Sequence, residues 1–172
     1  MELYRQVSYE LAGRLTRRYS TSFSMSSRLF ASRIRPHIYA VYGMVRLADE
    51  IVDTYRGDDA LAQLDNFESA VYQACDQGYS TNPIVHAFAL TARKYGIERE
   101  LISPFFASMR MDITDMEYDE AAYRRYIYGS AEVVGLMCLK VFVEGDEAQY
   151  GQLRDGASRL GAAYQKVNFC VT

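Results

Sequence analysis

Two acidic residues stand four positions apart inside an otherwise apolar stretch, which reads RLADEIVD over residues 46–53. Each residue of a helix turns by about 100°, so Asp49 and Asp53 would lie nearly one above the other, with Arg46 one turn earlier. Tyr42 falls on the same stripe. The flanking residues are mainly apolar, whereas a surface helix shows a broad polar face. We therefore expect the stripe to line a wet internal cavity.

Carboxylates at this spacing suit a metal ion. In a partly dry site they raise each other's pKa unless a cation lies between them. Mg²⁺ takes one or two protein carboxylates and completes its shell with water and substrate phosphate. The alternative is an ordinary ion-pair ladder with Arg46 on a solvated helix, since such pairs are common and contribute only about 0.2–0.5 kcal/mol each. The apolar flanks favour the metal site but leave the ladder open.

Two further motifs allow both a structural and a functional interpretation. Ser20, Thr21 and Ser22 stand together in YSTSFS, where their hydroxyls could hold phosphate oxygens or cap a helix. The segment YIYGSAEVVG, residues 126–135, places small residues in an apolar helix. Because glycine costs about 1 kcal/mol relative to alanine inside a helix, something must approach closely there. A neighbouring helix and a substrate chain explain this equally well.

Polar residues elsewhere give weaker signals. Gln165 and Asn168 stand three apart, so both can face one way or both can be solvated amides. Asp112 in MRMDITD belongs to the interior or simply closes its helix. Neither motif alone indicates a particular chemistry.

The elements that must position these residues are helices. Nearly every segment has helical periodicity, and no convincing strand pattern appears. The expected helices cover about residues 3–19, 36–57, 59–77, 83–95, 104–112, 119–143 and 147 to the end. The stretch STSFSMSS, residues 20–27, is too rich in serine and threonine for a helix interior and is predicted to interrupt them. We expect one all-α domain packed around a central space.

Bulk properties exclude several classes of protein. A chain of 172 residues suits one domain with a sizeable core. The formal charge of -3 argues against a nucleic-acid binder that works through a basic surface. No run approaches the ~20 apolar residues that span a bilayer. Cys75, Cys138 and Cys170 have neither metal nor disulfide spacing, so we expect a reducing, cytoplasmic setting.

Five motifs together resemble a known family. They are, in chain order, YSTSF, IYAVYGMVRLADEIVD, SMRMDITD, YIYGSAEVVGLMCLKVF and LGAAYQKVNF. They resemble the squalene/phytoene synthase family, most closely its bacterial phytoene synthases, over essentially the whole chain. The resemblance implies an isoprenoid-synthase-type helical domain around a central cavity. It also implies head-to-head condensation of two geranylgeranyl diphosphates through a cyclopropyl diphosphate, in carotenoid biosynthesis, with Mg²⁺ as cofactor and Mn²⁺ as a substitute.

The resemblance assigns a role to each matching residue. It implies that Asp49 and Asp53 hold the metal and act in catalysis, and that Tyr128 lies near the reacting carbons. Asn168 is implied to be a metal ligand at the start of a second metal-binding motif. The residues implied to contact substrate are Tyr19, Ser20, Thr21, Ser22, Phe23, Tyr42, Arg46 and Gln165.

The sequence departs from the family pattern at its end. After Asn168 the family continues with an arginine-aspartate pair, but here Val171 and Thr172 stand at those positions. We therefore expect residues 1–172 to be the amino-terminal part of such a domain, with the C-terminal helices missing. Two alternatives remain open: coupling of farnesyl diphosphate by a squalene or dehydrosqualene synthase-type reaction, and an inactive module that binds prenyl diphosphate. The expected partners are a prenyl diphosphate and, peripherally, a membrane that receives the hydrocarbon product, with no nucleic acid.

Overall fold

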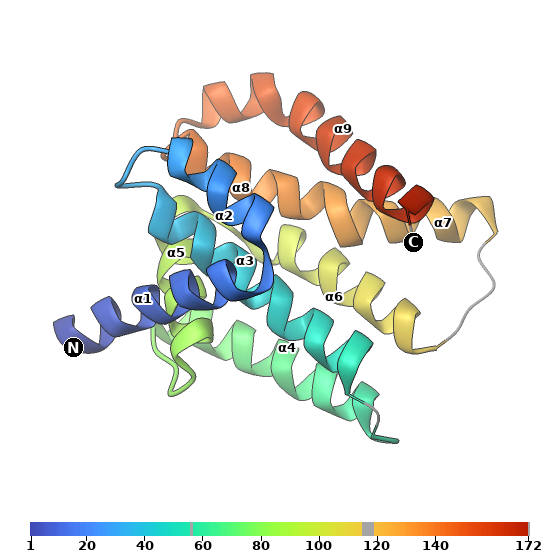
Figure 1. Ribbon diagram of the computed structural model, residues 1–172, viewed down its shortest axis with the longest axis horizontal. Coiled ribbons are helices and arrows are strands. Elements are labelled where there is room, and N and C mark those ends of the chain that lie inside the picture. Colours follow the sequence, from blue (N-terminus) through green and yellow to red (C-terminus); the bar gives the residue numbers. More distant parts are fainter. Residues whose placement is uncertain (56, 115–118, 172) are drawn as a thin grey trace.

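The structure is a computed structural model that describes residues 1–55, 57–114 and 119–171, with side chains described up to Gln165. Every regular element in these ranges is helical, which confirms the predicted all-α class (Figure 1). The elements are α1 (Glu2–Tyr19), α2 (Thr21–Ser26), η1 (Ser27–Leu29), α3 (Arg35–Asp49), η2 (Glu50–Thr54), α4 (Ala60–Gln77), α5 (Pro83–Tyr95), α6 (Arg99–Ile113), α7 (Glu120–Ile127), η3 (Tyr128–Glu132), α8 (Val133–Phe142) and α9 (Glu147–Val171).

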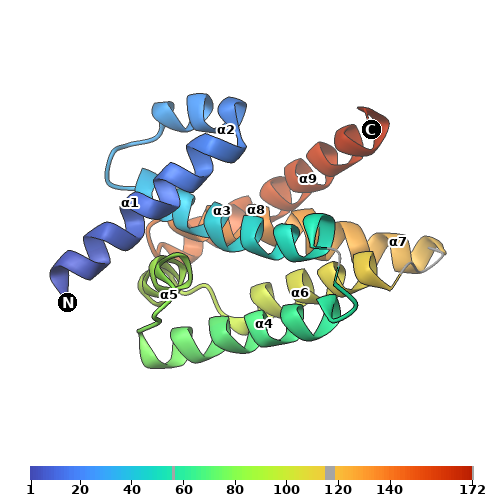
Figure 2. The ribbon, with the colours of Figure 1, turned by 60° about the horizontal axis from the view of Figure 1, so that its bottom comes forward.

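The helices pack in levels around one main core. Figure 2 shows α4 and α6 side by side below α3 and α8, with α1 and α2 above on one side and α9 on the other. Helix α3 contacts α1, α5 and α8, and therefore lies at the centre of the packing. The largest fully buried side chains of the core include Phe88, Phe105, Phe106, Met44, Ile38 and Met137.

Capping residues set several helix limits as predicted. The Asn82 side chain accepts hydrogen bonds from the N–H groups of Ile84 at 3.0 Å and Val85 at 3.3 Å, and Pro83 begins α5. Gly96 ends α5 with φ +68°, a conformation that glycine adopts without steric cost. Asp119 begins α7 by accepting from the N–H of Ala122 at 2.6 Å.

The prediction that residues 20–27 interrupt the helices was wrong, because α2 and η1 form there. The Ser20 side chain caps α2 by accepting from the Phe23 N–H at 3.3 Å. Ser26 and Ser27 instead donate to carbonyls within their own turns, at 2.9 Å to Ser22 and 2.8 Å to Ser24. The hydroxyls that were expected to compete with the helix therefore bond along it.

The start of α6 was also predicted wrongly. Proline favours the first helical turn, so the helix was expected to begin at Pro104. It begins at Arg99 and contains Pro104 in its interior. Burial of Ile102, Phe105 and Phe106 on this helix outweighs the backbone hydrogen bond that the proline cannot donate.

Two of the predicted continuous helices contain a wide π turn. The first, η2, follows α3 and is closed by the bond from the Tyr55 N–H to the Glu50 carbonyl at 3.0 Å. The second, η3, separates α7 from α8. Wide turns of this kind are rare and occur frequently at functional sites. Here they contain Asp53 and Tyr128, two of the predicted site residues.

The small residues near η3 accommodate neighbouring helices. A Cβ at Gly129 would overlap the Pro104 carbonyl and the Ser108 hydroxyl of α6, and one at Gly135 would lie 3.1 Å from the Ala157 carbonyl of α9. The Ser108 hydroxyl lies 3.2 Å from the Tyr126 carbonyl, just before the wide turn. Helix packing therefore accounts for these two glycines.

The expectations about membrane-spanning segments and cysteines can be compared with the described residues. Within them, no helix combines the length and apolar character that crossing a bilayer requires. Cys75 and Cys138 are free thiols, and the side chain of Cys170 lies outside the described residues.

Candidate active site

The acidic stripe begins on the last turn of α3 and continues into η2. Asp49 is half-buried, with 30% of its side chain exposed, and burial together with the charge of Asp53 raises the pKa of the Asp49 carboxyl to about 6. Arg46 partly offsets this increase, and the charge of Asp112 adds to it. The three carboxylates are therefore close enough to interact electrostatically. Asp53 is exposed, so the stripe runs from the interior towards the surface.

Asp112 belongs to the interior rather than merely closing α6. Its carboxylate accepts a hydrogen bond from the Tyr126 hydroxyl of α7 at 3.3 Å. Burial raises the pKa of Asp112 to about 6; the Tyr126 hydrogen bond lowers this pKa and the charge of Asp53 raises it. Sequence reasoning had left Asp112 undecided. Its position near the end of a helix gave no signal, because the decisive contacts come from η2 and α7.

Arg46 pairs mainly with a residue that the sequence analysis did not single out. Its guanidinium donates to Glu50 at 2.7 Å and reaches Asp49 only at 3.9 Å. It also lies 4.5 Å above the ring of Tyr19, whose hydroxyl donates to Glu50 at 3.1 Å. Arg46 therefore does form an ion pair along the helix, as the alternative interpretation expected, but its principal partner is Glu50 rather than Asp49 or Asp53. The Arg46 Nε is buried and finds no hydrogen-bond partner among the described residues.

The segment before α3 places one aromatic pair beside this arginine. Phe23 stacks on Tyr42 with ring centroids 5.2 Å apart and an interplanar angle of 16°. Burial raises the pKa of Tyr42, and nearby Arg46 partly offsets that increase. Ser20 caps α2, as in the structural interpretation, while Thr21 and Ser22 expose their side chains.

The remaining predicted residues lie on other elements. Tyr128 is on η3 with 38% of its surface exposed, and Gln165 is half-buried on α9. Within the described part of the chain, no hydrogen bond joins either side chain to the acidic stripe. The side chain of Asn168 lies outside the described residues, so its predicted role as a metal ligand stays a prediction.

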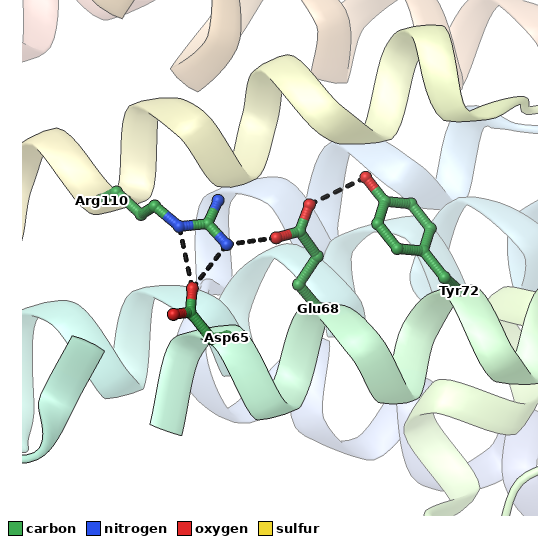
Figure 3. Close-up of polar contacts among 4 residues, drawn as sticks. All are labelled: Asp65, Glu68, Tyr72 and Arg110. Carbon is green, nitrogen blue, oxygen red and sulfur yellow. Dashed lines mark hydrogen bonds and ion pairs between the residues drawn. The ribbon is translucent and has the colours of Figure 1, made fainter. Parts of the chain in front are cut away.

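A polar network fixes the helix that carries Asp112 (Figure 3). Arg110 donates through Nε and Nη2 to Asp65 of α4, at 2.9 and 2.6 Å, and also binds Glu68. The Tyr72 hydroxyl donates to the second Glu68 oxygen at 2.8 Å. Both N–H groups donate to the same Asp65 oxygen, and the charge-assisted bond to Glu68 fixes the guanidinium further. The network therefore ties α6 to α4.

The donor atoms of the stripe fit a hard cation. Carboxylate oxygens are the ligands that Mg²⁺ prefers, and a cation would relieve the repulsion that raises the pKa of Asp49. No set of three His, Cys, Asp or Glu side chains in the described ranges is arranged to hold a metal by itself. Mg²⁺ at phosphate sites usually uses one or two protein carboxylates, a number that Asp49 and Asp53 would match.

Comparison with known proteins identifies the family of this chain. The model of the squalene/phytoene synthase family matches residues 16–171. The chain belongs to the squalene/phytoene synthase family. The family resemblance inferred from the ordered motifs is thereby confirmed.

Individual relatives of the squalene/phytoene synthase family are similar over most of this chain. Phytoene synthase from Arthrospira platensis is 29% identical over 139 residues, covering 80% of this chain and 45% of the relative. The 4,4'-diapophytoene synthase from Staphylococcus haemolyticus is 24% identical over 166 residues, covering 94% and 56%. The crystal structure of squalene synthase HpnC from Alicyclobacillus acidocaldarius superposes with a TM-score of 0.83 at 27% identity, covering 96% and 61%. The chain spans about half the length of the curated relatives it matches.

Proposed function

We propose that this chain supplies the diphosphate-binding side of a head-to-head prenyltransferase. The observation that carries the proposal is the acidic stripe, in which half-buried Asp49 and exposed Asp53 interact beside Arg46. A diphosphate needs both a cation bridge and hydrogen-bond donors. This stripe offers carboxylate ligands for the first and the partly exposed guanidinium of Arg46 for the second. Membership of a family of synthases supports a transferase reaction.

Mg²⁺, with Mn²⁺ as a substitute, is the cofactor we propose. Asp49 and Asp53 would hold it, together with Asn168 if its predicted role is correct. When bound, the metal would offset the negative charge that develops on the departing diphosphate. Asp49 must be deprotonated to serve as a ligand, so metal affinity should fall as the pH drops below about 6.

Other residues would bind and orient the substrate. The Arg46 guanidinium is fixed by Glu50 and Tyr19, which pre-orders it for an anionic group. Ser20, Thr21 and Ser22 would add hydroxyl donors from the start of α2, and the stacking of Phe23 on Tyr42 places this segment beside α3.

Aromatic side chains would contact the prenyl chain. The rings of Phe23 and Tyr42 offer an apolar wall next to Arg46. The aromatic ring of Tyr128 is proposed to stabilise an allylic cation. Gln165 is proposed as a further substrate contact from α9.

The length of the prenyl chain separates two versions of this proposal. The phytoene synthase version condenses two geranylgeranyl diphosphates through a cyclopropyl diphosphate, in carotenoid biosynthesis. The other couples farnesyl diphosphate in the manner of squalene or dehydrosqualene synthases. Relatives of both kinds match this chain at similar identity. Incubation with each diphosphate and Mg²⁺, followed by identification of the hydrocarbon by mass spectrometry, distinguishes the two versions.

A binding module without turnover is a second candidate function. Among the described residues, the carboxylates that interact with one another are Asp49 of α3, Asp53 of η2 and Asp112 of α6. These helices form one side of a site, which favours this candidate. Catalysis requires the leaving diphosphate to be stabilised as its charge develops, and one side of a site suits binding better than ionisation. Titration with geranylgeranyl thiodiphosphate, with and without Mg²⁺, measures binding, and a radiolabelled assay measures turnover. Mg²⁺-dependent binding without product would support the module, and absence of both would refute each candidate.

A cytoplasmic protein with a peripheral membrane contact completes the proposal. A C30 or C40 hydrocarbon product would partition into a bilayer, so an enzyme that releases one benefits from lying close to a membrane. Fractionation of cells that express the tagged chain would test both parts of this location.

A further inference from the structure

Charge is distributed unevenly along the chain. Residues 1–35 contain seven arginines and two glutamates, a formal charge of +5, whereas residues 36–172 contain 12 basic and 20 acidic residues, a formal charge of -8. The total of -3 hides this asymmetry. A basic segment in an acidic protein indicates an anionic partner for that segment.

The outward side of α1 combines aliphatic and basic side chains. Leu3, Val7 and Leu11 follow one another every four residues and expose 74%, 37% and 37% of their surface. The opposite side of the helix is buried through Ser8, Ala12 and Thr16. The aliphatic row therefore faces away from the protein rather than into its core.

Three arginines continue this side towards the end of α1. Arg14, Arg17 and Arg18 are exposed, and none of them has an ion pair or hydrogen bond with another described residue. Neither glutamate of α1 forms an ion pair with these arginines: Glu2 pairs with Arg5, and Glu10 accepts a hydrogen bond from Gln6 at 3.2 Å. We call the six residues Leu3, Val7, Leu11, Arg14, Arg17 and Arg18 the outer face of α1.

The residues next to the outer face of α1 are also apolar and basic. A hollow of about 500 Å³ between α1 and the start of α5 is lined by apolar Leu11, Leu15 and Ile84 and bordered by Arg14 and Arg18. Such a hollow offers apolar walls for an acyl chain and cations for its head group.

The following elements also expose apolar side chains. Met25 of α2 and Leu29 of η1 expose 62% and 88% of their surface. Figure 2 shows α2 beside the end of α1, on the upper side of the molecule. Exposed apolar residues next to unpaired arginines are typical of surfaces that enter the interface of a bilayer.

We propose that the outer face of α1 binds the surface of an anionic lipid bilayer. The aliphatic row would insert at the level of the head groups, and the arginines would contact lipid phosphates. Association with a second copy fits less well, because the outer face of α1 contains no acidic residue that could pair with the three arginines of the other copy. A nucleic acid fits less well because its phosphates give Leu3, Val7 and Leu11 nothing apolar to contact. This inference rests on the peripheral membrane contact of the proposed function and names the surface that makes it. The vesicle test below involves neither prenyl diphosphate nor turnover, so its failure can be told apart from a failure of the proposed reaction.

Vesicle sedimentation tests this proposal. The protein is mixed with vesicles of phosphatidylcholine, or of phosphatidylcholine and phosphatidylglycerol in equal amounts, at low and high salt. We expect binding to the anionic vesicles that weakens with salt, and much weaker binding to the neutral ones. Each arginine near an anionic surface contributes about fivefold to the partition coefficient, so R14Q/R17Q/R18Q should lose on the order of a hundredfold.

A control variant tests whether binding depends on the arginines of this face or only on the total charge of the protein. R125Q/R154Q/R159Q removes three exposed arginines elsewhere and should bind vesicles like the wild type. L3S/V7S/L11S should also lose binding while keeping its circular dichroism spectrum, because these side chains are exposed. Equal binding to both vesicle types, equal loss in the two arginine variants, or a dimer that L3S/V7S/L11S dissociates in place of vesicle binding would each overturn the proposal.

Discussion

Arg110 and Asp112 stand two residues apart on α6 and bind different neighbours: Arg110 binds Asp65 and Glu68 of α4, whereas Asp112 accepts the hydroxyl of Tyr126 from α7. Residues at this spacing point to nearly opposite sides of a helix. The last turns of α6 are therefore held on both sides, and the position of Asp112 relative to Asp53 depends on both attachments.

We expect Arg110→Gln to lower the free energy of unfolding by about 1–3 kcal/mol, because Glu68 would lose the cation that compensates its partial burial. Urea denaturation measures this change. The control is Arg124→Gln, which removes an ion pair with Glu120 whose two side chains are both more than three-quarters exposed. That variant should change stability by less than about 1 kcal/mol. Equal effects would show that the Arg110 network does not stabilise the fold.

Asp49→Asn should stabilise the metal-free protein at neutral pH. The pKa of Asp49 is raised to about 6 by burial and by Asp53, whereas an unfolded aspartate has a pKa of about 3.9. Between these values the folded state binds more protons than the unfolded state, so wild-type stability falls as the pH rises through this window. The variant avoids that loss and should be more stable by about 2 kcal/mol at pH 7, with no gain at pH 4. Thermal unfolding in a chelator at both pH values provides the measurement, and a gain that is independent of pH would contradict the cause given.

The same stripe should be required for ligand binding. We expect Asp49→Asn and Asp53→Asn each to remove the Mg²⁺ dependence of prenyl thiodiphosphate binding while the helix content stays unchanged, because both would remove metal ligands. Calorimetric titration and circular dichroism check the two parts. Asp58→Asn removes an exposed carboxylate just beyond η2 and serves as the control. Mg²⁺-dependent binding that survives in both site variants would refute the metal role.

Arg46→Lys should weaken binding of the same ligand by roughly five- to tenfold although the charge is kept. An ammonium cannot contact Glu50, stack on Tyr19 and still present a planar N–H to an anion as the guanidinium can. Arg154→Lys on exposed α9 should leave the affinity unchanged. Unchanged affinity in Arg46→Lys would reduce Arg46 to a structural partner of Glu50.

Gly129→Ala should lower the free energy of unfolding by about 1–3 kcal/mol, because its Cβ would overlap the Pro104 carbonyl and force α6 and η3 apart. Gly156→Ala in α9 is the matched control, since a Cβ there meets no atom within 4 Å. It should raise stability by up to about 1 kcal/mol through helix propensity. Chemical denaturation of the two variants gives opposite signs if close packing is the reason for Gly129.

Local signals were sufficient to predict most of the helices. Asn82, Gly96 and Asp119 act through hydrogen bonds or backbone angles within a few residues, so their effects can be inferred from the sequence. The start of α6 could not be inferred, because burial of Phe105 and Phe106 against distant elements decides it. The wide turns were missed for the same reason: their fit against α6 is a tertiary property.

For the candidate site too, local spacing predicted some features, and others depend on contacts between distant elements. Helical spacing predicted that Asp49 and Asp53 would lie close together, and the charge of Asp53 does raise the pKa of half-buried Asp49. Their role as metal ligands stays a prediction. The roles of Glu50 and Asp112 escaped prediction, because one depends on how Tyr19 and Arg46 meet and the other on the approach of α7. Functional roles for Tyr128 and Gln165 stay predictions.

The wide turn η3 also affects which deletions the chain can tolerate. A π turn holds one residue more than an α turn, so removal of one residue from Tyr128–Glu132 can restore a regular helix without changing the phase of α7 relative to α8. Removal of a residue within α8 would instead rotate everything after it by about 100° and turn its buried side away from the core. Natural length variation in this long helix should therefore concentrate at the wide turn, where a loss of one residue preserves both packed surfaces.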